Sequence, residues 1–318
     1  MRLHIIGKLL KMKYLKLIRW PNLLIIAITM LLVRYAIIWP HLGNVGSEAM
    51  VPLHVFLILV LASVLTAASG YIINDLFDTD VDSINKPEKM LIGREIRFST
   101  ARQLYWILVS TTILLAAYLG YVVQSWRLSV VIIMMNGLLW FYSKRYKRMN
   151  LVGNVVIAYA SSLSLIIVWL TDFLSLTGKP QLFAEASLLF PKITGTLLVY
   201  TLFSFLTSMI REMVKDIEDV EGDKRYGCRS FAVVAGVESA RMMAIGLNVI
   251  LLIMILVWQY VLWQINNFYA FSFLFIVVIN AVATLYQLYF AKEKSNYSRV
   301  SFLLKVLMVS GLASMVFL

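Results

Sequence analysis

Two acidic stretches organise this chain: N-D-L-F-D-T-D-V-D, from Asn74 to Asp82, and D-I-E-D-V-E-G-D, from Asp216 to Asp223. Aspartates recur in both at i, i+3 and i+7: a first row of Asp75, Asp78 and Asp82, and a second row of Asp216, Asp219 and Asp223. On a helix these positions fall within roughly 60° of one another, so each row forms one acidic stripe. Like charges at this spacing repel, so the sequence predicts a cation that compensates them.

The composition is that of a protein that crosses a membrane many times. Hydrophobic residues make up 61% of the 318 residues, charged residues only 14%, and the mean hydropathy is +0.82. These values lie outside the range of soluble domains. In a membrane protein the basic residues behind the formal charge of +12 indicate which connections are cytoplasmic. We therefore expect no nucleic-acid partner. Cys228 is the only cysteine, which excludes an intrachain disulfide and a thiolate metal cluster.

Nine apolar segments are long enough to cross the hydrocarbon core of a bilayer. We expect spans near 21–40, 53–74, 104–123, 127–143, 151–171, 191–215, 240–263, 267–291 and 300–318. The prediction is an all-α membrane protein with nine transmembrane helices in one bundle, forming a single domain over 1–318. Residues 1–19 combine basic and apolar residues without a small-residue cleavage site, which indicates a basic interfacial N-terminal helix.

Basic residues concentrate in alternate connections, beginning with the N-terminus. They follow the second, fourth, sixth and eighth spans, whereas the opposite side has only Arg127, Lys179 and Lys192. This asymmetry predicts that the N-terminus and both acidic rows are cytoplasmic, in the cell membrane if the organism is a prokaryote. Arg34 is the one cation deep in a predicted span, and we expect it to reach the outer interface.

A weak internal repeat relates the two halves of the chain. Each acidic row follows a long apolar span and precedes a basic, turn-rich loop, after which Ser99–Arg102 and Glu238–Arg241 open the next spans. The pattern indicates two parallel four-helix repeats plus a ninth helix.

All-carboxylate rows favour hard divalent cations, and Mg²⁺ combines a few carboxylates with substrate phosphates. Two such rows on one side of the membrane therefore imply a polyphosphate ligand, and the bilayer suggests that the group attached to it is lipidic. An allylic prenyl diphosphate would ionise to a carbocation that the apolar bundle shields from water. Basic candidates for holding the diphosphate are Lys89, Arg94, Lys144, Arg211 and Lys215. Tyr142 and Ser143 are candidates for lining the reacting centre.

The two motifs, N-D-x-x-D-x-x-x-D and D-x-x-D-x-x-x-D in a nine-span chain, resemble those of the UbiA superfamily of intramembrane prenyltransferases. The resemblance covers nearly the whole chain and implies a helical bundle with a cytoplasmic cavity, a Mg²⁺-dependent prenyl diphosphate donor and lateral access for apolar substrates. It implies that Asn74 and the six aspartates bind the Mg²⁺–diphosphate, with the six aspartates as the metal-binding and catalytic residues. Asn22, in R-x-P-N, and Tyr142-Ser143 are also similar to family positions near the cavity.

The run R-E-M-V-K-D-I-E-D-V-E-G-D from Arg211 is similar to the digeranylgeranylglyceryl phosphate synthase branch. This resemblance implies transfer of a geranylgeranyl group to geranylgeranylglyceryl phosphate, which forms an ether lipid and releases diphosphate. The run is also similar to the homogentisate and chlorophyll branches, so an aromatic acceptor of quinone, tocopherol or chlorophyll type stays open. In the first loop, 85–93, Lys89 replaces an arginine of the commoner family pattern.

A cation transporter or channel with acidic vestibules is the alternative from another functional class. A transporter should carry ionisable groups near mid-membrane, whereas both rows here lie at the ends of spans on one side. We therefore favour the enzyme, whose partners would be the bilayer, a prenyl diphosphate donor and a lipidic acceptor, with no obligate protein partner evident.

Overall fold

The computed structural model describes residues 12–85, 88 and 90–318. Within this part the chain is helical, and nine helices are long and apolar enough to cross a membrane, which confirms the predicted all-α bundle of nine spans. Of the predicted N-terminal helix, residues 1–11 lie outside the described residues, whereas 12–17 are helical.

Nine spans account for most of the described chain. The first is composite, with α2 Trp20–Leu32, the π-helix η1 Val33–Ile38 and α3 Trp39–Leu42 in succession. The others are α4 Leu53–Phe77, α6 Phe98–Val122, α7 Trp126–Lys144, α8 Val152–Thr177, α10 Phe190–Glu218, α13 Val237–Gln264, α14 Phe268–Phe290 and α15 Lys294–Ala313, which continues as η5 Ser314–Phe317. The third and ninth helices begin several residues before the predicted spans, because their polar first turns are helical as well.

Short helices form the connections between these spans. Those at the end of the bundle opposite the acidic rows are η2 Ser47–Ala49 and α9 Pro180–Ser187. Those at the end that carries the rows are α5 Thr79–Asn85, η4 Tyr146–Arg148, α11 Val220–Arg225 and α12 Phe231–Val234.

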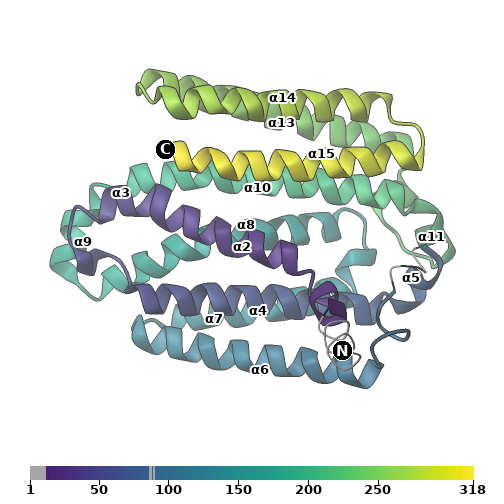
Figure 1. Cartoon of the computed structure of the whole chain (residues 1–318), viewed down its shortest axis with the longest axis horizontal. Coiled ribbons are helices and arrows are strands. Elements are labelled where there is room, and N and C mark those ends of the chain that lie inside the picture. Colours follow the sequence, from purple (N-terminus) through teal and green to yellow (C-terminus); the bar gives the residue numbers. More distant parts are fainter. Residues whose placement is uncertain (1–11, 86–87, 89) are drawn as a thin grey trace, which may run out of the picture.

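The spans pack in sequence order, and the ninth helix is inserted into the second half. In the first half, α4, α6 and α7 pack against one another and α2 packs on α4, while α8 pairs with α10 in the second. Figure 1 shows α15 between α10 and the α13–α14 pair, and it packs against both α10 and α14. The eighth span therefore packs on the sixth through α15, whereas the fourth packs on the second directly, so the two predicted repeats are similar but not identical.

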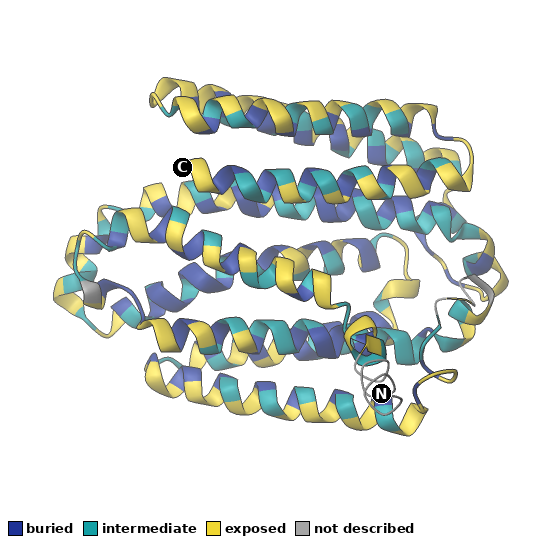
Figure 2. Cartoon of the chain, viewed as in Figure 1, coloured by how far each residue is buried: buried dark blue, intermediate teal, exposed yellow. Residues whose placement is uncertain are grey.

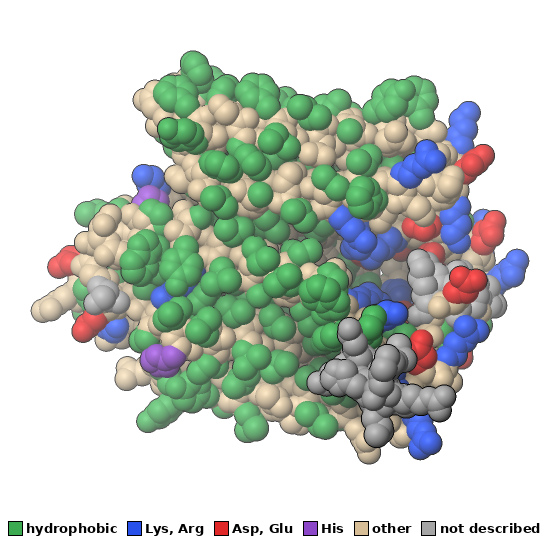
Figure 3. Space-filling model, in the orientation of Figure 1, with side chains coloured by type: hydrophobic (Ala, Val, Ile, Leu, Met, Phe, Trp, Pro, Cys, Tyr) green, Lys and Arg blue, Asp and Glu red, His purple; other side chains and the backbone are tan. Residues whose placement is uncertain are grey.

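Apolar side chains cover the outside of the bundle as well as its interior. Large exposed residues on the spans include Trp106, Ile107, Leu114 and Ile279, each more than half exposed. Figure 2 shows exposed positions along the length of the helices, and Figure 3 shows that hydrophobic side chains occupy them. An aqueous protein would not expose an apolar surface this continuous, so these faces suit contact with lipid.

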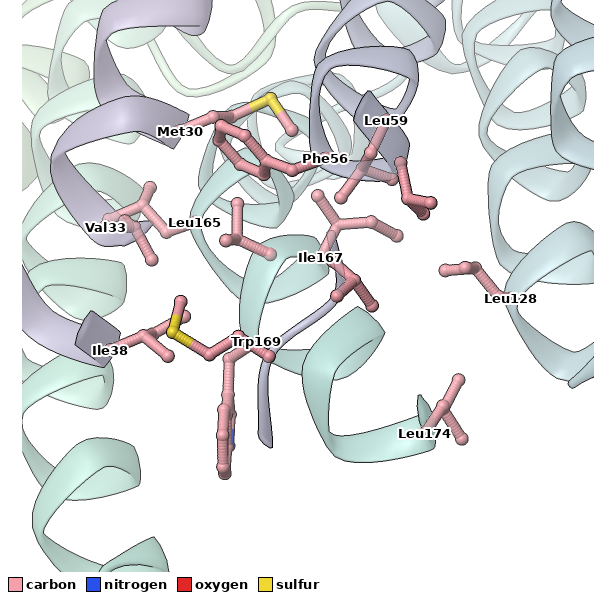
Figure 4. Packing of buried hydrophobic residues seen from close by; sticks show 14 of the residues in the cluster. Met30, Val33, Ile38, Phe56, Leu59, Leu128, Leu165, Ile167, Trp169 and Leu174 are labelled. Atoms are coloured by element: carbon pink, nitrogen blue, oxygen red, sulfur yellow. The ribbon is translucent and has the colours of Figure 1, made fainter. Parts of the chain in front are cut away.

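The largest buried cluster lies in the half of the bundle away from the acidic rows. Met30, Phe56, Leu165 and Trp169 belong to it and come from α2, α4 and α8 (Figure 4). Because side chains from three helices interdigitate here, this end of the bundle is fixed by packing.

Two buried charged side chains, Arg34 and Asp172, are linked through the Val51 backbone at this end, and the burial of Arg34 overturns one prediction. Arg34 is only 4% exposed, so the expectation that it reaches the outer interface is wrong. Its Nη2 donates to the Val51 carbonyl at 2.7 Å, and the Val51 N–H donates to Asp172 Oδ1 at 2.8 Å. The guanidinium also stacks 4.6 Å from the Phe56 ring centroid. One backbone unit thus links a buried cation to a buried anion, which fixes the connection between the first two spans.

Candidate active site

Each acidic row crosses a helix end at its middle aspartate. Asp75 lies on α4 and Asp82 on α5, and Asp78 separates them with φ −93° and ψ 1°. In the second row Asp219 separates α10 from α11 with nearly the same geometry, φ −100° and ψ 6°. The expected single helix per row is therefore replaced by a matched break in each half of the chain. The Asp78 and Asp82 amides still donate to carbonyls four residues earlier, at 2.9 and 2.8 Å. The helical path therefore continues across the break, and the three aspartates of the first row stay on the same side of the chain.

The two rows meet at one end of the bundle. The short helices that follow them, α5 and α11, contact each other and lie side by side in Figure 1. Lys147, on η4, forms an ion pair with Asp78 of the first row. Its ammonium also interacts electrostatically with Asp216 and Asp223 of the second row. One lysine therefore faces both rows, as a shared site requires.

Lys147 is the central residue that sequence reasoning missed. In the sequence it belongs to a run of four basic residues after the fourth span, where it was counted as an orientation signal. Burial alone would lower the pKa of Lys147, but Asp78 and other acidic neighbours raise the pKa above its ordinary value, so the side chain stays charged. Because α7 ends at Lys144 and η4 turns the chain, the fold aims Lys147 at the rows.

A glycine makes this turn possible. A Cβ on Gly153 would lie 2.9 Å from both the Lys147 Cα and the Tyr146 carbonyl oxygen, so any larger residue would push η4 away from α8. The close approach of η4 to α8 brings Lys147 over the acidic rows.

Polar side chains orient one aspartate of each row. Asn74 donates to Asp78 Oδ2 at 2.7 Å, and Asn154 of α8 donates to Asp216 Oδ2 at 2.8 Å. Asn74 was predicted as a site residue, whereas Asn154 was not, because no spacing in the sequence links it to the second row. Each amide holds one carboxylate oxygen and leaves the other for a further partner.

The first span begins beside the first row. Arg19 has a left-handed backbone, φ 51°, and its Nη2 lies 2.7 Å from Asp75 Oδ1. Burial lowers the pKa of Arg19, but Asp75, Tyr71 and Glu212 together raise the pKa above its ordinary value. The guanidinium also stacks 4.8 Å from the centroid of Tyr71, whose hydroxyl accepts from Asn22 at 3.2 Å. The predicted residue Asn22 thus reaches the site through Tyr71.

The other predicted residues fall into three groups. Tyr142 is buried and interacts electrostatically with carboxylates of both rows, whereas the adjacent Ser143 is buried and donates to the Leu139 carbonyl at 2.9 Å. Arg211 and Lys215 both contact Glu212 on α10. Arg94 is exposed in a loop, Lys144 lies over the Trp140 ring at 4.6 Å, and Lys89 lies outside the described residues.

The carboxylates of the two rows fit a magnesium ion whose remaining coordination positions are taken by oxygens of the substrate. Among the described residues, no three acidic, histidine or cysteine side chains are gathered closely enough to hold an ion alone. Mg²⁺ does not need such a cage, since it takes one or two carboxylates together with waters and phosphate oxygens. Burial raises the pKa of Asp223, and repulsion from Asp219 raises it further, so an added cation would relieve a charge that the fold disfavours.

These features define a class of protein: a polytopic membrane protein with two carboxylate rows that face a lysine at one end of an apolar bundle. The chain belongs to the UbiA prenyltransferase family, whose profile matches residues 43–309. It is 31% identical over 257 residues to the digeranylgeranylglyceryl phosphate synthase of Sulfurisphaera tokodaii, covering 80% of this chain and 84% of the relative. This membership makes the chain a membrane prenyltransferase and removes the transporter alternative.

Solved structures show the same fold. One, which concerns the biosynthesis of digeranylgeranylglyceryl phosphate synthase in membranes, has a TM-score of 0.63, 23% identity and 96% coverage of both chains. A UbiA homologue from Archaeoglobus fulgidus bound to DMAPP and Mg²⁺ has a TM-score of 0.52 and 18% identity, covering 96% of this chain and all of that one.

Proposed function

We propose that this protein transfers a geranylgeranyl group from its allylic diphosphate to the free hydroxyl of geranylgeranylglyceryl phosphate. The reaction forms an ether bond to the glycerol and releases diphosphate. The observation that carries the proposal is the convergence of both acidic rows on Lys147, at the end of a bundle whose interior and surface are apolar. Similarity to the synthase of Sulfurisphaera tokodaii supports this particular acceptor.

The aspartates of the two rows and Asn74 would hold Mg²⁺ and the diphosphate. When bound, the metal supplies charge neutralisation to the departing diphosphate oxygens. Asn154 and Asn74 orient the carboxylates of Asp216 and Asp78 before any ligand arrives. Preorganisation of this kind removes the cost of arranging the ligand oxygens during the reaction.

Lys147 and Tyr142 contribute from the centre of the site. The ammonium of Lys147 offsets the carboxylates of the rows and would bind a diphosphate oxygen once metal shares those carboxylates. Tyr142 is buried and interacts electrostatically with Asp216 and Asp78, one aspartate of each row, so its ring would face the allylic carbon and stabilise positive charge there. The buried helices around it exclude water, which would otherwise capture a prenyl cation. Lys89, Arg94, Lys144 and Ser143 remain proposed substrate-binding residues.

The proposed orientation places the N-terminus and the site in the cytoplasm, with residues 1–318 as one membrane domain. The bias of lysine and arginine toward alternate connections supports this orientation. Figure 3 shows basic side chains clustered at the end of the molecule that carries the rows. A water-soluble donor diphosphate would then reach the site from the cytoplasm while its prenyl chain enters the bundle.

The test is product identification with purified full-length protein. Labelled geranylgeranyl diphosphate and Mg²⁺ are supplied with geranylgeranylglyceryl phosphate, dihydroxynaphthoate or hydroxybenzoate, and products are identified by mass. We expect a prenylated glycerol phosphate, and a loss of about 10²-fold or more in Asp78→Asn and Asp219→Asn. The control is Asp80→Asn, because Asp80 is exposed and off the row. Prenylation of an aromatic acceptor alone would refute the acceptor, and equal activity of all four proteins would refute the site.

A further inference from the structure

A second group of charged residues lies on α10, one turn before the second acidic row. Lys215 Nζ lies 2.7 Å from Glu212 Oε1, and Arg211 Nη1 lies 3.1 Å from the same oxygen. The three side chains are 31%, 20% and 16% exposed for Lys215, Arg211 and Glu212, so the group is largely screened from water. Arg19 adds electrostatic interactions with Glu212 and with Lys215.

The charges within this group do not balance. Arg19 is matched by Asp75, which leaves Glu212 as the carboxylate that faces both Arg211 and Lys215. Both cations contact the same oxygen of Glu212, so much of their donor capacity is unused. Within the described part of the chain, Arg211 Nε is buried and has no hydrogen-bond partner. A buried cation with spare donors is costly unless an anion accepts from it.

Arg211 and Lys215 lie on a different flank of α10 from Asp216, and Glu212 lies between them and the second row. Successive residues on a helix point about 100° apart, so Lys215 and Asp216 face different neighbours. Asp216 accepts from Asn154 of α8, whereas Lys215 interacts electrostatically with Arg19 at the start of the first span. Glu212 interacts with Arg19 on that side and with Asp216 and Lys147 on the other. The rows and Lys147 therefore form one anion site, and the Arg211–Lys215 group forms an adjacent one.

We infer that Arg211 and Lys215, positioned by Glu212, bind the phosphate of the acceptor rather than the diphosphate of the donor. The inference rests on the proposed function and names the substrate class that the site selects: a lipid alcohol that carries a phosphomonoester. A phosphomonoester carries up to two negative charges and three acceptor oxygens, which match the excess charge and the free donors of this group. Tyr142 interacts with Glu212 as well as with both rows, so an acceptor held here has its hydroxyl beside the reacting carbon.

The test separates the Michaelis constants of the two substrates. Full-length Arg211→Gln/Lys215→Gln in vesicles of neutral lipid is compared with wild type at varied geranylgeranylglyceryl phosphate and at varied geranylgeranyl diphosphate. We expect the acceptor KM to rise about 30-fold, because two charged hydrogen bonds are lost, while the donor KM changes less than about threefold. The control, Arg225→Gln/Lys292→Gln, removes the same charge from two exposed positions and should change neither constant.

A phosphate-free acceptor gives a readout that general damage cannot imitate. With geranylgeranylglycerol, wild type and Arg211→Gln/Lys215→Gln should react at rates within about threefold, because the lost contact was to the missing phosphate. A third variant that adds Glu212→Gln leaves no unpaired carboxylate, so it should show the same acceptor defect even if the double variant is unstable. A donor KM that rises in step with the acceptor KM would overturn the inference.

Failure of the proposed function would look different. If wild type releases no diphosphate with any acceptor, binding of labelled geranylgeranylglyceryl phosphate to the purified proteins decides the inference by itself. Binding that is lost in the double variant but kept in the control would support the phosphate site. Equal binding by both variants would refute it.

Discussion

Replacing Lys147 by methionine tests the centre of the proposed mechanism. The substitution removes the ammonium but keeps an unbranched apolar stem, so among the described contacts Asp78 keeps its bond from Asn74. The Asp78 side chain is 6% exposed and that of Lys147 is 39% exposed, so a buried carboxylate loses a partly hydrated partner. Loss of one preorganised donor costs about 10²- to 10³-fold in rate. Because water and metal share the charge with a partly exposed lysine, we expect the lower end, about 10²-fold or about 2.7 kcal/mol.

The assay is diphosphate release from geranylgeranyl diphosphate at saturating acceptor, repeated over a series of Mg²⁺ concentrations. In wild type the ammonium competes with the metal for Asp78, so its removal should let Mg²⁺ bind more tightly. A site-to-site coupling of this kind is typically worth fivefold or more, and we expect the Mg²⁺ midpoint to fall by about fivefold. Lower turnover combined with tighter metal binding is a pattern that simple unfolding does not produce.

The control is Lys292→Met, since Lys292 is exposed in the connection before α15. It should leave both the turnover and the Mg²⁺ midpoint unchanged. If Lys147→Met turns over at the wild-type rate, or if its Mg²⁺ requirement rises while turnover falls, then Lys147 does not join the two rows in the way the structure indicates.

Three further predictions concern other parts of the molecule. Asn154→Leu should lower turnover about tenfold, because Asp216 loses the donor that orients it, and steady-state kinetics with Asn154→Asp as comparison will measure this. Asp172→Ala should destabilise the fold by about 3 kcal/mol, because Arg34 is left buried without its counter-ion. Thermal melts should show this loss of stability, while the Mg²⁺ midpoint of the turnover assay should stay unchanged. Alkylation of Cys228 should be slow at pH 7 and accelerate only at high pH, since burial and then a second-row carboxylate raise the pKa of its thiol; fast labelling at pH 7 would contradict this.

Much of the fold and of the candidate site follows from the sequence, because both depend on local pattern. Span length is set by bilayer thickness and a rise of about 1.5 Å per residue, so apolar runs located nine helices without any tertiary information. The repeated aspartate spacing located both rows, since residues one and two turns apart share a side of the chain. Predictions were wrong where a residue has a partner far away in the sequence. Arg34 is buried because it is linked through Val51 to Asp172 of the fifth span, and the sequence around Arg34 does not indicate this partner.

What the sequence determined by itself is the class of molecule and the identity of its carboxylate rows, because hydropathy and helical spacing are properties of consecutive residues. The tertiary structure alone decided which cation stands between the rows and which amides aim them. Lys147 and Asn154 are brought to the rows by the turn after α7 and by the packing of α8 on α10. Such contacts depend on the distance between neighbouring helices, for example the close approach of α8 to η4 at Gly153. The periodicity of residues along the chain does not predict the distance between two helices.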